Sequence, residues 1–294
     1  MHWAVKLVRT SPVALALLLL TLAGTHAAAM TRHQDIVYAT VDHQTLALDL
    51  YLPTDIKHPA LIVWVHGGAW SLGDKSQVPQ ALLNQGFALA SLDFRQATQA
   101  RFPAQAHDIK AAIRFLRAKA DEHGYRADRI AIAGASSGGH LAALVGVTNG
   151  HRELEGAVGE YLKHSSNVQA ILSYFGASNL TTIIAQSTPF GLGVRKPALD
   201  RLLGAQPDAV PELARLASPV FHVSKDSPPL LLLHGDQDPQ MPINQAHELQ
   251  GAYEKLGRDV TFDVVHGAAH GGDQFHAPEH LNKVIAFLRR TLGQ

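Results

Sequence analysis

The sequence predicts an α/β protein with a mostly parallel central sheet flanked by helices, and three observations support this class. Short, nearly continuous apolar runs recur along the chain, as in strands buried on both faces of a parallel sheet. Segments with helical periodicity separate these runs, which implies right-handed crossover connections. Two alternating apolar and polar runs near the start of the chain indicate an antiparallel hairpin.

About eight strands are expected, and the first two form the hairpin. "IVYATV" (36–41) and "TLALDLYL" (45–52) are joined by "DHQ", and we expect both at an edge of the sheet. The buried strands are expected at residues 60–65, 87–92, 130–134, 168–175, 229–235 and 261–265.

The clearest helix is expected at residues 103–123. Pro103 suits a first helical turn, Ile109 and Ile113 fall on one stripe, and Gly124 is a typical terminator. Further helices are expected at residues 78–85, 137–148, 243–256 and 278–292.

Two long insertions interrupt this alternation, at residues 149–167 and 178–227. Both hold glycines, and the second also holds prolines and short helical patterns at 198–203 and 211–217. Long insertions between core strands usually carry function, so the second is expected to form a small cap over the site.

The first 29 residues have the layout of a secretory signal. Lys6 and Arg9 precede the apolar stretch 13–22, and small residues at 27–29 offer a cleavage site before Met30. The alternative is a retained membrane anchor, although the stretch is shorter than the ~20 residues that a span needs. We therefore expect an exported, periplasmic or secreted protein, with residues 30–294 as one domain.

Composition excludes several classes of function. The chain has no cysteine, which rules out disulfides and thiol chemistry. Lys and Arg together number 25, as do Asp and Glu, and no basic cluster follows the leader, so a nucleic-acid partner is disfavoured. Once the leader is removed, no stable membrane insertion is expected, and the sequence does not define the oligomeric state.

The most informative stretch is "GASSGGH" (134–140), which lies between a predicted strand and a predicted helix. Gly134-x-Ser136-x-Gly138 matches the nucleophile elbow, a strained turn that exposes a serine hydroxyl. Ser137 fits the pattern on one side only. Ser136 is therefore the predicted nucleophile, and the backbone N–H of Ser137 is a predicted oxyanion donor; the alternative is a plain turn with an N-cap serine.

A serine nucleophile needs a base and an orienting carboxylate, which in this pattern follow in the order acid, then histidine. "DQDP" offers Asp236 and Asp238 after one strand, and "HGAAHGG" offers His266 and His270 after the last. We favour Asp238, because it lies further into the loop, and His270, because it sits amid small residues that let an imidazole reach Ser136.

"HGG" at residues 66–68 ends another predicted strand, where Gly67 and Gly68 can offer N–H groups to an oxyanion. His66 is expected to hold the loop by hydrogen bonds. A metal site built from the many histidines is the competing interpretation, but the pair His266 and His270 lies in a glycine-rich loop without an H-E-x-x-H pattern. No metal or organic cofactor is expected.

"HGGAWSLGDK", "DFRQA", "RIAIAGASSGGHLAAL", "LLLLHGDQDPQMP" and "GAAHGG" together resemble the α/β-hydrolase fold across nearly the whole mature chain. The resemblance is to bacterial feruloyl and acetylxylan esterases of the BD-FAE type, close to the hormone-sensitive-lipase-like carboxylesterases. It implies a catalytic domain at 30–294 with Ser136, Asp238 and His270 as catalytic residues and Gly67, Gly68 and Ser137 as oxyanion donors.

The chain departs from that pattern at three places. Ser137 stands where alanine is usual, Asn179 where aspartate is usual, and Gln240-Met241 where an aliphatic pair is usual. None of these departures changes a residue of the predicted triad, but all of them affect the expected substrate specificity.

A short-chain carboxylesterase is the first functional hypothesis. A feruloyl or acetylxylan esterase of plant polysaccharide is second and an arylformamidase third, ahead of a peptidase. A non-catalytic binding protein of the same fold is the rival from another class.

Overall fold

The computed structural model describes residues 1–2 and 29–294, so nearly all of the predicted leader lies outside the described residues. Eight strands form one sheet in the order β1-β2-β4-β3-β5-β6-β7-β8. Their bounds are β1 Met30–Val41, β2 Gln44–Pro53, β3 Leu61–Val65, β4 Ala88–Leu92, β5 Ile130–Ala135, β6 Ala170–Tyr174, β7 Leu230–Gly235 and β8 Val260–Val265. The pairs β1/β2 and β2/β4 are antiparallel and all others are parallel, which confirms the predicted fold class.

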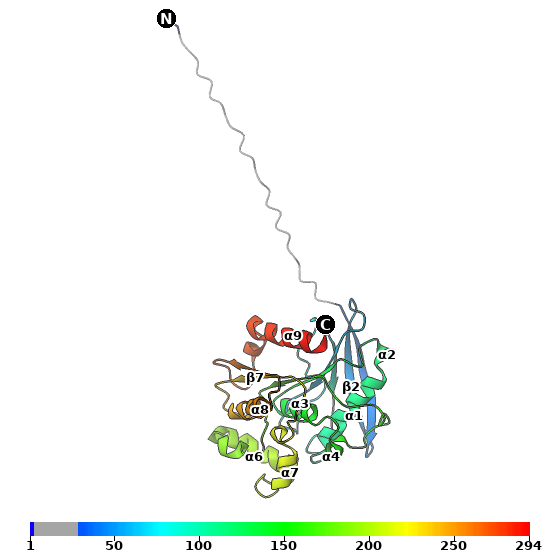
Figure 1. Cartoon of the computed structure of the whole chain (residues 1–294), viewed down its shortest axis with the longest axis vertical. Coiled ribbons are helices and arrows are strands. Elements are labelled where there is room, and N and C mark those ends of the chain that lie inside the picture. The colour runs from blue at the N-terminus through cyan, green and yellow to red at the C-terminus, as the bar shows by residue number, and fades with distance from the viewer. Residues whose placement is uncertain (3–28) are drawn as a thin grey trace.

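Helices cover both faces of the sheet, with α9 on one face and α1, α3 and α8 on the other (Figure 1). Alternate residues of each central strand enter the two layers, as in β3, where Val63 joins one and Ile62 the other. The helices are α1 Ala104–Ala118, α2 Ala120–His123, α3 Ser137–Val147, α4 Arg152–Glu155, α5 Ile183–Gln186, α6 Pro189–Leu203, α7 Pro211–Leu216, α8 Asn244–Lys255 and α9 Pro278–Leu292, with 3-10 turns η1 Pro219–Phe221 and η2 Asp273–His276.

Three predictions about elements were wrong. Residues 78–85 form turns instead of a helix, because Pro79 interrupts the segment and Asn84 has a left-handed φ of 64°. The predicted helix 103–123 is interrupted at Lys119, although Gly124 ends it as expected.

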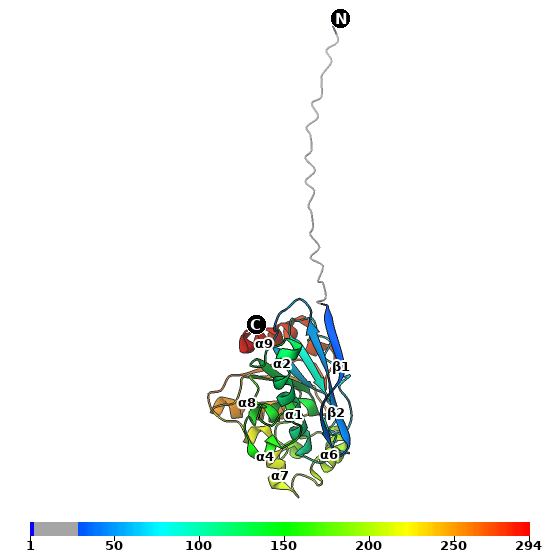
Figure 2. The same ribbon diagram turned by 90° about the vertical axis from the view of Figure 1, so that its right-hand side faces the viewer.

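The third error concerns the edges of the sheet. β1 is an edge strand, as Figure 2 shows, but β2 is interior because β4 pairs with its other side. β8 forms the opposite edge and is only partly buried, unlike the central strands.

The first insertion, residues 149–167, is joined to α1 by a buried charge network. Lys110 Nζ donates to a Glu155 carboxylate oxygen over 3.1 Å, and Arg114 Nη1 donates to the other over 2.5 Å. Ser166 Oγ also donates to Glu155 over 2.7 Å. Burial alone would raise the pKa of Glu155, but Lys110, Ser166 and Arg114 outweigh it and hold that pKa below its usual value.

This network predicts that Glu155→Gln destabilises the fold. The change leaves Lys110 and Arg114 buried without their anion, and we expect a loss of about 3 kcal/mol at pH 7 in urea unfolding. The native pKa of Glu155 is lowered, so its stabilisation is fully present above the usual value of 4.5 and is lost as pH falls through the native pKa. The difference between wild type and Glu155→Gln should therefore shrink in acid.

Glu153→Gln, on the exposed side of the same short helix, is the matched control and should leave stability unchanged. Equal stability of the two variants at neutral pH would contradict the prediction.

Candidate active site

Ser136 lies at the turn between β5 and α3, and its backbone conformation is unusual for a serine. Its φ is 55° and its ψ is −122°, a strained combination of the kind that clusters at functional sites. A Cβ at Gly134 would lie 2.4 Å from the carbonyl oxygen of Gly138, and one at Gly138 would lie 2.1 Å from that of Val65. The two glycines are thus needed where β3, β5 and α3 approach each other.

The loops after β7 and β8 bring an acid and an imidazole to Ser136. Ser136 Oγ lies 2.8 Å from His270 Nε2, and His270 Nδ1 lies 2.6 Å from Asp238 Oδ2. An ionised carboxylate only accepts, so Nδ1–H donates to Asp238 and Nε2 is left to accept the Ser136 hydroxyl proton. The three side chains therefore form one continuous chain of hydrogen bonds.

The Asp238 side chain is fully buried, and its carboxylate accepts several hydrogen bonds. Its Oδ1 accepts the backbone N–H groups of Gln240 and Met241, each over 2.8 Å, and His234 Nε2 lies 3.4 Å from Oδ2. Burial alone would raise the pKa of Asp238, but His234, His270 and the N–H of Met241 outweigh it and hold that pKa well below its usual range. The carboxylate is ionised at neutral pH.

The two residues that the sequence offered as alternatives form a separate pair. Asp236 Oδ2 lies 2.8 Å from His266 Nδ1, and the His266 side chain is 84% exposed. Asp236 and His266 thus form a hydrogen-bonded pair at the surface, two and four residues away in sequence from the pair that meets Ser136.

The three predicted oxyanion donors lie around Ser136. Ser137 is the first residue of α3, where backbone N–H groups have no acceptor within the helix. Gly67 packs so closely that a Cβ there would lie 3.4 Å from Ser136 Cβ. Gly68 has a φ of 119°, and it lines one groove with Gly67, Ser136 and His270.

The loop that follows Gly68 is anchored to the start of the sheet. Lys75 Nζ lies 2.8 Å from Asp35 and 3.0 Å from the buried Asp49 of β2. The Lys75 N–H also donates to Asp93 over 2.8 Å. These contacts fix the segment that carries Gly67 and Gly68.

Two further histidines near the site have structural contacts. His66 Nδ1–H donates to the Gly67 carbonyl over 2.7 Å, and its ring stacks on Phe94. His140 accepts from Trp70 Nε1 over 3.0 Å and donates through Nε2 to the Ala217 carbonyl over 2.7 Å. The hydrogen bonds of His140 thus connect its helix to other segments, and burial lowers its pKa to about 4.

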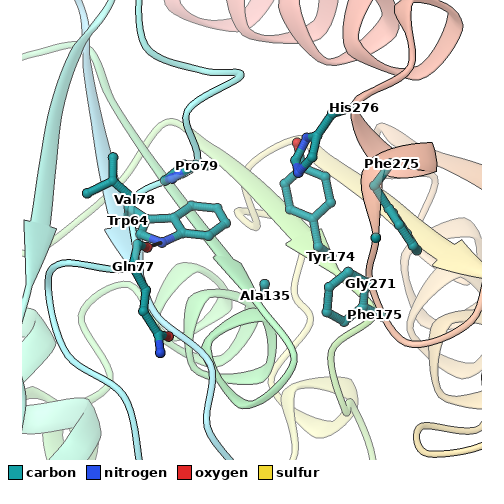
Figure 3. A pocket seen from close by; sticks show the side chains of 11 residues that line it. Trp64, Gln77, Val78, Pro79, Ala135, Tyr174, Phe175, Gly271, Phe275 and His276 are labelled. Atoms are coloured by element: carbon teal, nitrogen blue, oxygen red, sulfur yellow. Dashed lines mark hydrogen bonds between the residues drawn. The ribbon is translucent and has the colours of Figure 1, made fainter.

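The site opens into two adjoining spaces. A groove of about 510 Å³ holds Ser136 and His270, and Leu72 on its wall is 69% exposed. A smaller pocket of about 260 Å³ is walled by Trp64, Tyr174 and other aromatic rings (Figure 3). Both share Ala135, the residue before Ser136, so the small pocket lies beside the serine.

Sequence reasoning did not find the aromatic wall, His234 or Arg195. Trp64 and Tyr174 lie within apolar strands, where aromatic residues are typical of any core. His234 does carry a signal, since it interrupts the apolar run of β7 two positions before Asp236. Arg195 lies in α6, before the helical pattern predicted at 198–203, and no feature of the sequence around it indicates a role.

Two absences can be stated for residues 1–2 and 29–294. No helix there is both long and apolar enough to cross a bilayer. No group of three or more His, Asp or Glu side chains there could hold a metal ion.

Comparison with known proteins gives a family match and close structural likenesses. A family model described as BD-FAE matches residues 48–253, more than half of the chain. Esterase LipC of Mycobacterium tuberculosis is 31% identical over 79% of this chain. This chain spans 58% of LipC and about half the length of the other curated relatives it matches.

Two solved structures cover most of this chain. A truncated carbohydrate esterase from gut microbiota superposes with a TM-score of 0.82 at 31% identity, over 91% of this chain and 98% of that one. Esterase 2 of Thermogutta terrifontis, phosphonylated by sarin, superposes with a TM-score of 0.73 at 26% identity, over 90% and 95%.

The close packing at the serine turn predicts that Gly138→Ala is severely destabilising. The added methyl would overlap the carbonyl oxygens of Val65 and His66, and we expect a loss of about 3 kcal/mol or more in urea unfolding. Gly251→Ala in α8 is the control, because that site has open space and alanine favours helix by about 1 kcal/mol. A Gly138→Ala protein as stable as wild type would refute the packing argument.

Proposed function

We propose that this chain, which belongs to the BD-FAE family of α/β-hydrolases, is a serine hydrolase that cleaves carboxylic esters through an acyl-enzyme. The observation that carries the proposal is the hydrogen-bonded series Ser136, His270, Asp238. Its atoms have the order and spacing that activation of a serine hydroxyl requires.

In the first half-reaction, His270 Nε2 takes the Ser136 proton as the Ser136 oxygen attacks the ester carbonyl. Asp238 holds the imidazole in the required tautomer and stabilises the imidazolium that forms. Because Asp238 is buried and ionised, it is an effective partner for that positive charge.

The negative charge of the tetrahedral intermediate falls on the former carbonyl oxygen. The N–H groups of Gly67, Gly68 and Ser137 are the proposed donors to that oxygen. Removal of one such donor typically costs about 3 kcal/mol in the transition state. The glycines let the backbone approach closely, and the N-terminal end of α3 adds favourable electrostatic potential.

The leaving alcohol takes its proton from His270, which frees the base for the second half. A water molecule then gives a proton to His270 and attacks the acyl-enzyme, so the carboxylic acid leaves and Ser136 regains its hydrogen. Every proton that is removed in the two half-reactions is returned through His270 to the alcohol or to Ser136. The reaction therefore needs no cofactor.

A short-chain acyl group is the proposed substrate feature. The pocket of about 260 Å³ beside Ala135 would take the acyl group, because its walls are mostly apolar and its volume is small. The open groove would take the alcohol, which can extend past the exposed Leu72. Likeness to a carbohydrate esterase supports a feruloyl or acetylxylan ester of plant polysaccharide as the second candidate.

Residues 1–29 are proposed to export the chain, and residues 30–294 to form the catalytic domain with a cap at 178–227. β1 begins at Met30, directly after the proposed cleavage site, which supports that boundary.

The two serines of the turn should differ in their response to substitution. Ser136→Ala should abolish hydrolysis of an aryl acetate and the adduct with a serine-directed phosphonate, whereas Ser137→Ala should keep activity because it keeps the backbone N–H. Mass spectrometry of phosphonate-treated protein locates the adduct. Absence of both turnover and adduct in wild type would favour the non-catalytic binding protein.

The two Asp–His pairs provide a matched test of the acid. Asp238→Asn should lower kcat by roughly 10⁴-fold, because the imidazole loses its orienting carboxylate. Asp236→Asn, which changes the exposed pair, should leave kcat near wild type. Equal losses in the two variants would contradict the assignment.

A substrate panel tests the acyl pocket. Aryl esters with acyl groups from acetate to butyrate should react faster than methyl ferulate or N-formylkynurenine. Acetylated xylan is the second-ranked substrate. Val78→Phe, which narrows the small pocket, should lower the ratio of butyrate to acetate hydrolysis. Leu72→Phe, in the groove alone, should not change that ratio. A preference for ferulate would transfer the proposal to a feruloyl esterase.

A further inference from the structure

Arg195 of the cap helix α6 is a buried cation that has no carboxylate partner among residues 1–2 and 29–294. It is 2% exposed, and within the described part of the chain it forms no ion pair. Its Nη2 donates to the backbone carbonyl of Gln240 over 3.0 Å, and its Nε has no hydrogen-bond partner among the same residues. Burial lowers the pKa of Arg195 to about 10, and the field of Asp238 opposes that change.

A guanidinium in this environment is costly, because burial removes hydration that one carbonyl contact replaces only in part. A hydrophobic side chain of similar length would fill the same space without that cost. The contacts of Arg195 therefore indicate why a charged residue stands there. Arg195 makes two such contacts, and each is with a loop beside Ser136.

The first contact acts on the peptide group between Gln240 and Met241. The carbonyl of that group accepts from Arg195, while its N–H, on Met241, donates to Asp238 Oδ1 over 2.8 Å. A cation at one end and an anion at the other polarise the same peptide group, which strengthens both hydrogen bonds. His234 Nε2 donates to the next carbonyl, that of Met241, over 2.9 Å.

The second contact acts on the loop that carries Gly67 and Gly68. The Arg195 guanidinium carbon lies 5.7 Å from the ring centroid of Trp70, within the range of a cation–π interaction. Trp70 is 1% exposed and has a left-handed φ of 59°. Its ring is also held by His140, so Arg195 completes the packing around a strained residue of the oxyanion loop.

We propose that Arg195 is a positioning residue for ester hydrolysis, which fixes the Asp238 turn and the Trp70 loop relative to each other from the cap. This inference rests on the proposed function, because it concerns the geometry of Ser136, His270 and the oxyanion donors. Arg195 itself does not line the groove and is not expected to touch substrate.

The test compares Arg195→Met and Arg195→Lys with Arg201→Met, an exposed position of the same helix. Arg195→Met keeps the length but loses the charge and the donors, and we expect kcat for an aryl acetate to fall roughly 10- to 100-fold through misplacement of the catalytic groups. KM should change little, because the groove is intact. Arg195→Lys keeps a charge and a donor and should recover most of the loss.

Thermal unfolding of each variant shows whether it is folded. If Arg195→Met does not fold, Arg195→Gln takes its place, and we expect the same loss of kcat. A folded, neutral variant with wild-type kcat would overturn the proposal, as would equal losses in the neutral and Lys variants. Turnover by the wild type and the phosphonate adduct on Ser136 test the proposed function independently of Arg195. Failure of the proposed function can therefore be distinguished from failure of the positioning role.

Discussion

The close approach of α3 to the strands β3 and β5 is the constraint on which the site depends. It leaves no room for a Cβ at Gly134 or Gly138, and it holds Ser136 in a strained conformation. Strain of this kind costs on the order of 1–3 kcal/mol, which the buried sheet must offset. This conformation places the Ser136 hydroxyl beyond the end of the sheet. The N–H of Ser137 lies next to it, at the start of α3.

The same parallel sheet sets where the other groups can arrive. β3, β5, β7 and β8 all end at one edge, so the loops after them carry Gly67, Ser136, Asp238 and His270 to a common point. Ligands in open α/β sheets bind at this edge. Side chains distant in sequence can thus meet without any long irregular segment in the core.

Burial of polar groups around Ser136 rigidifies this arrangement. Asp238 and His140 are removed from water, yet each makes hydrogen bonds to backbone or to a neighbouring ring. Bonds of this kind connect separate segments: His140 joins α3 to Ala217, and Arg195 joins α6 to the turn after β7. Residues 178–227 therefore help to hold the site in place.

The sequence by itself determined the fold class, the strands and the location of the serine turn, because these depend on local periodicity and on glycines at fixed spacing. It also restricted the acid and base to two candidates each. The tertiary structure placed Asp238 and His270 at Ser136 and paired Asp236 with His266 at the surface, since a small shift along a loop reverses the direction of a side chain. It also decided the turns at 78–85, the interior place of β2 and the contacts of Arg195, because these follow from long-range packing that no local pattern encodes.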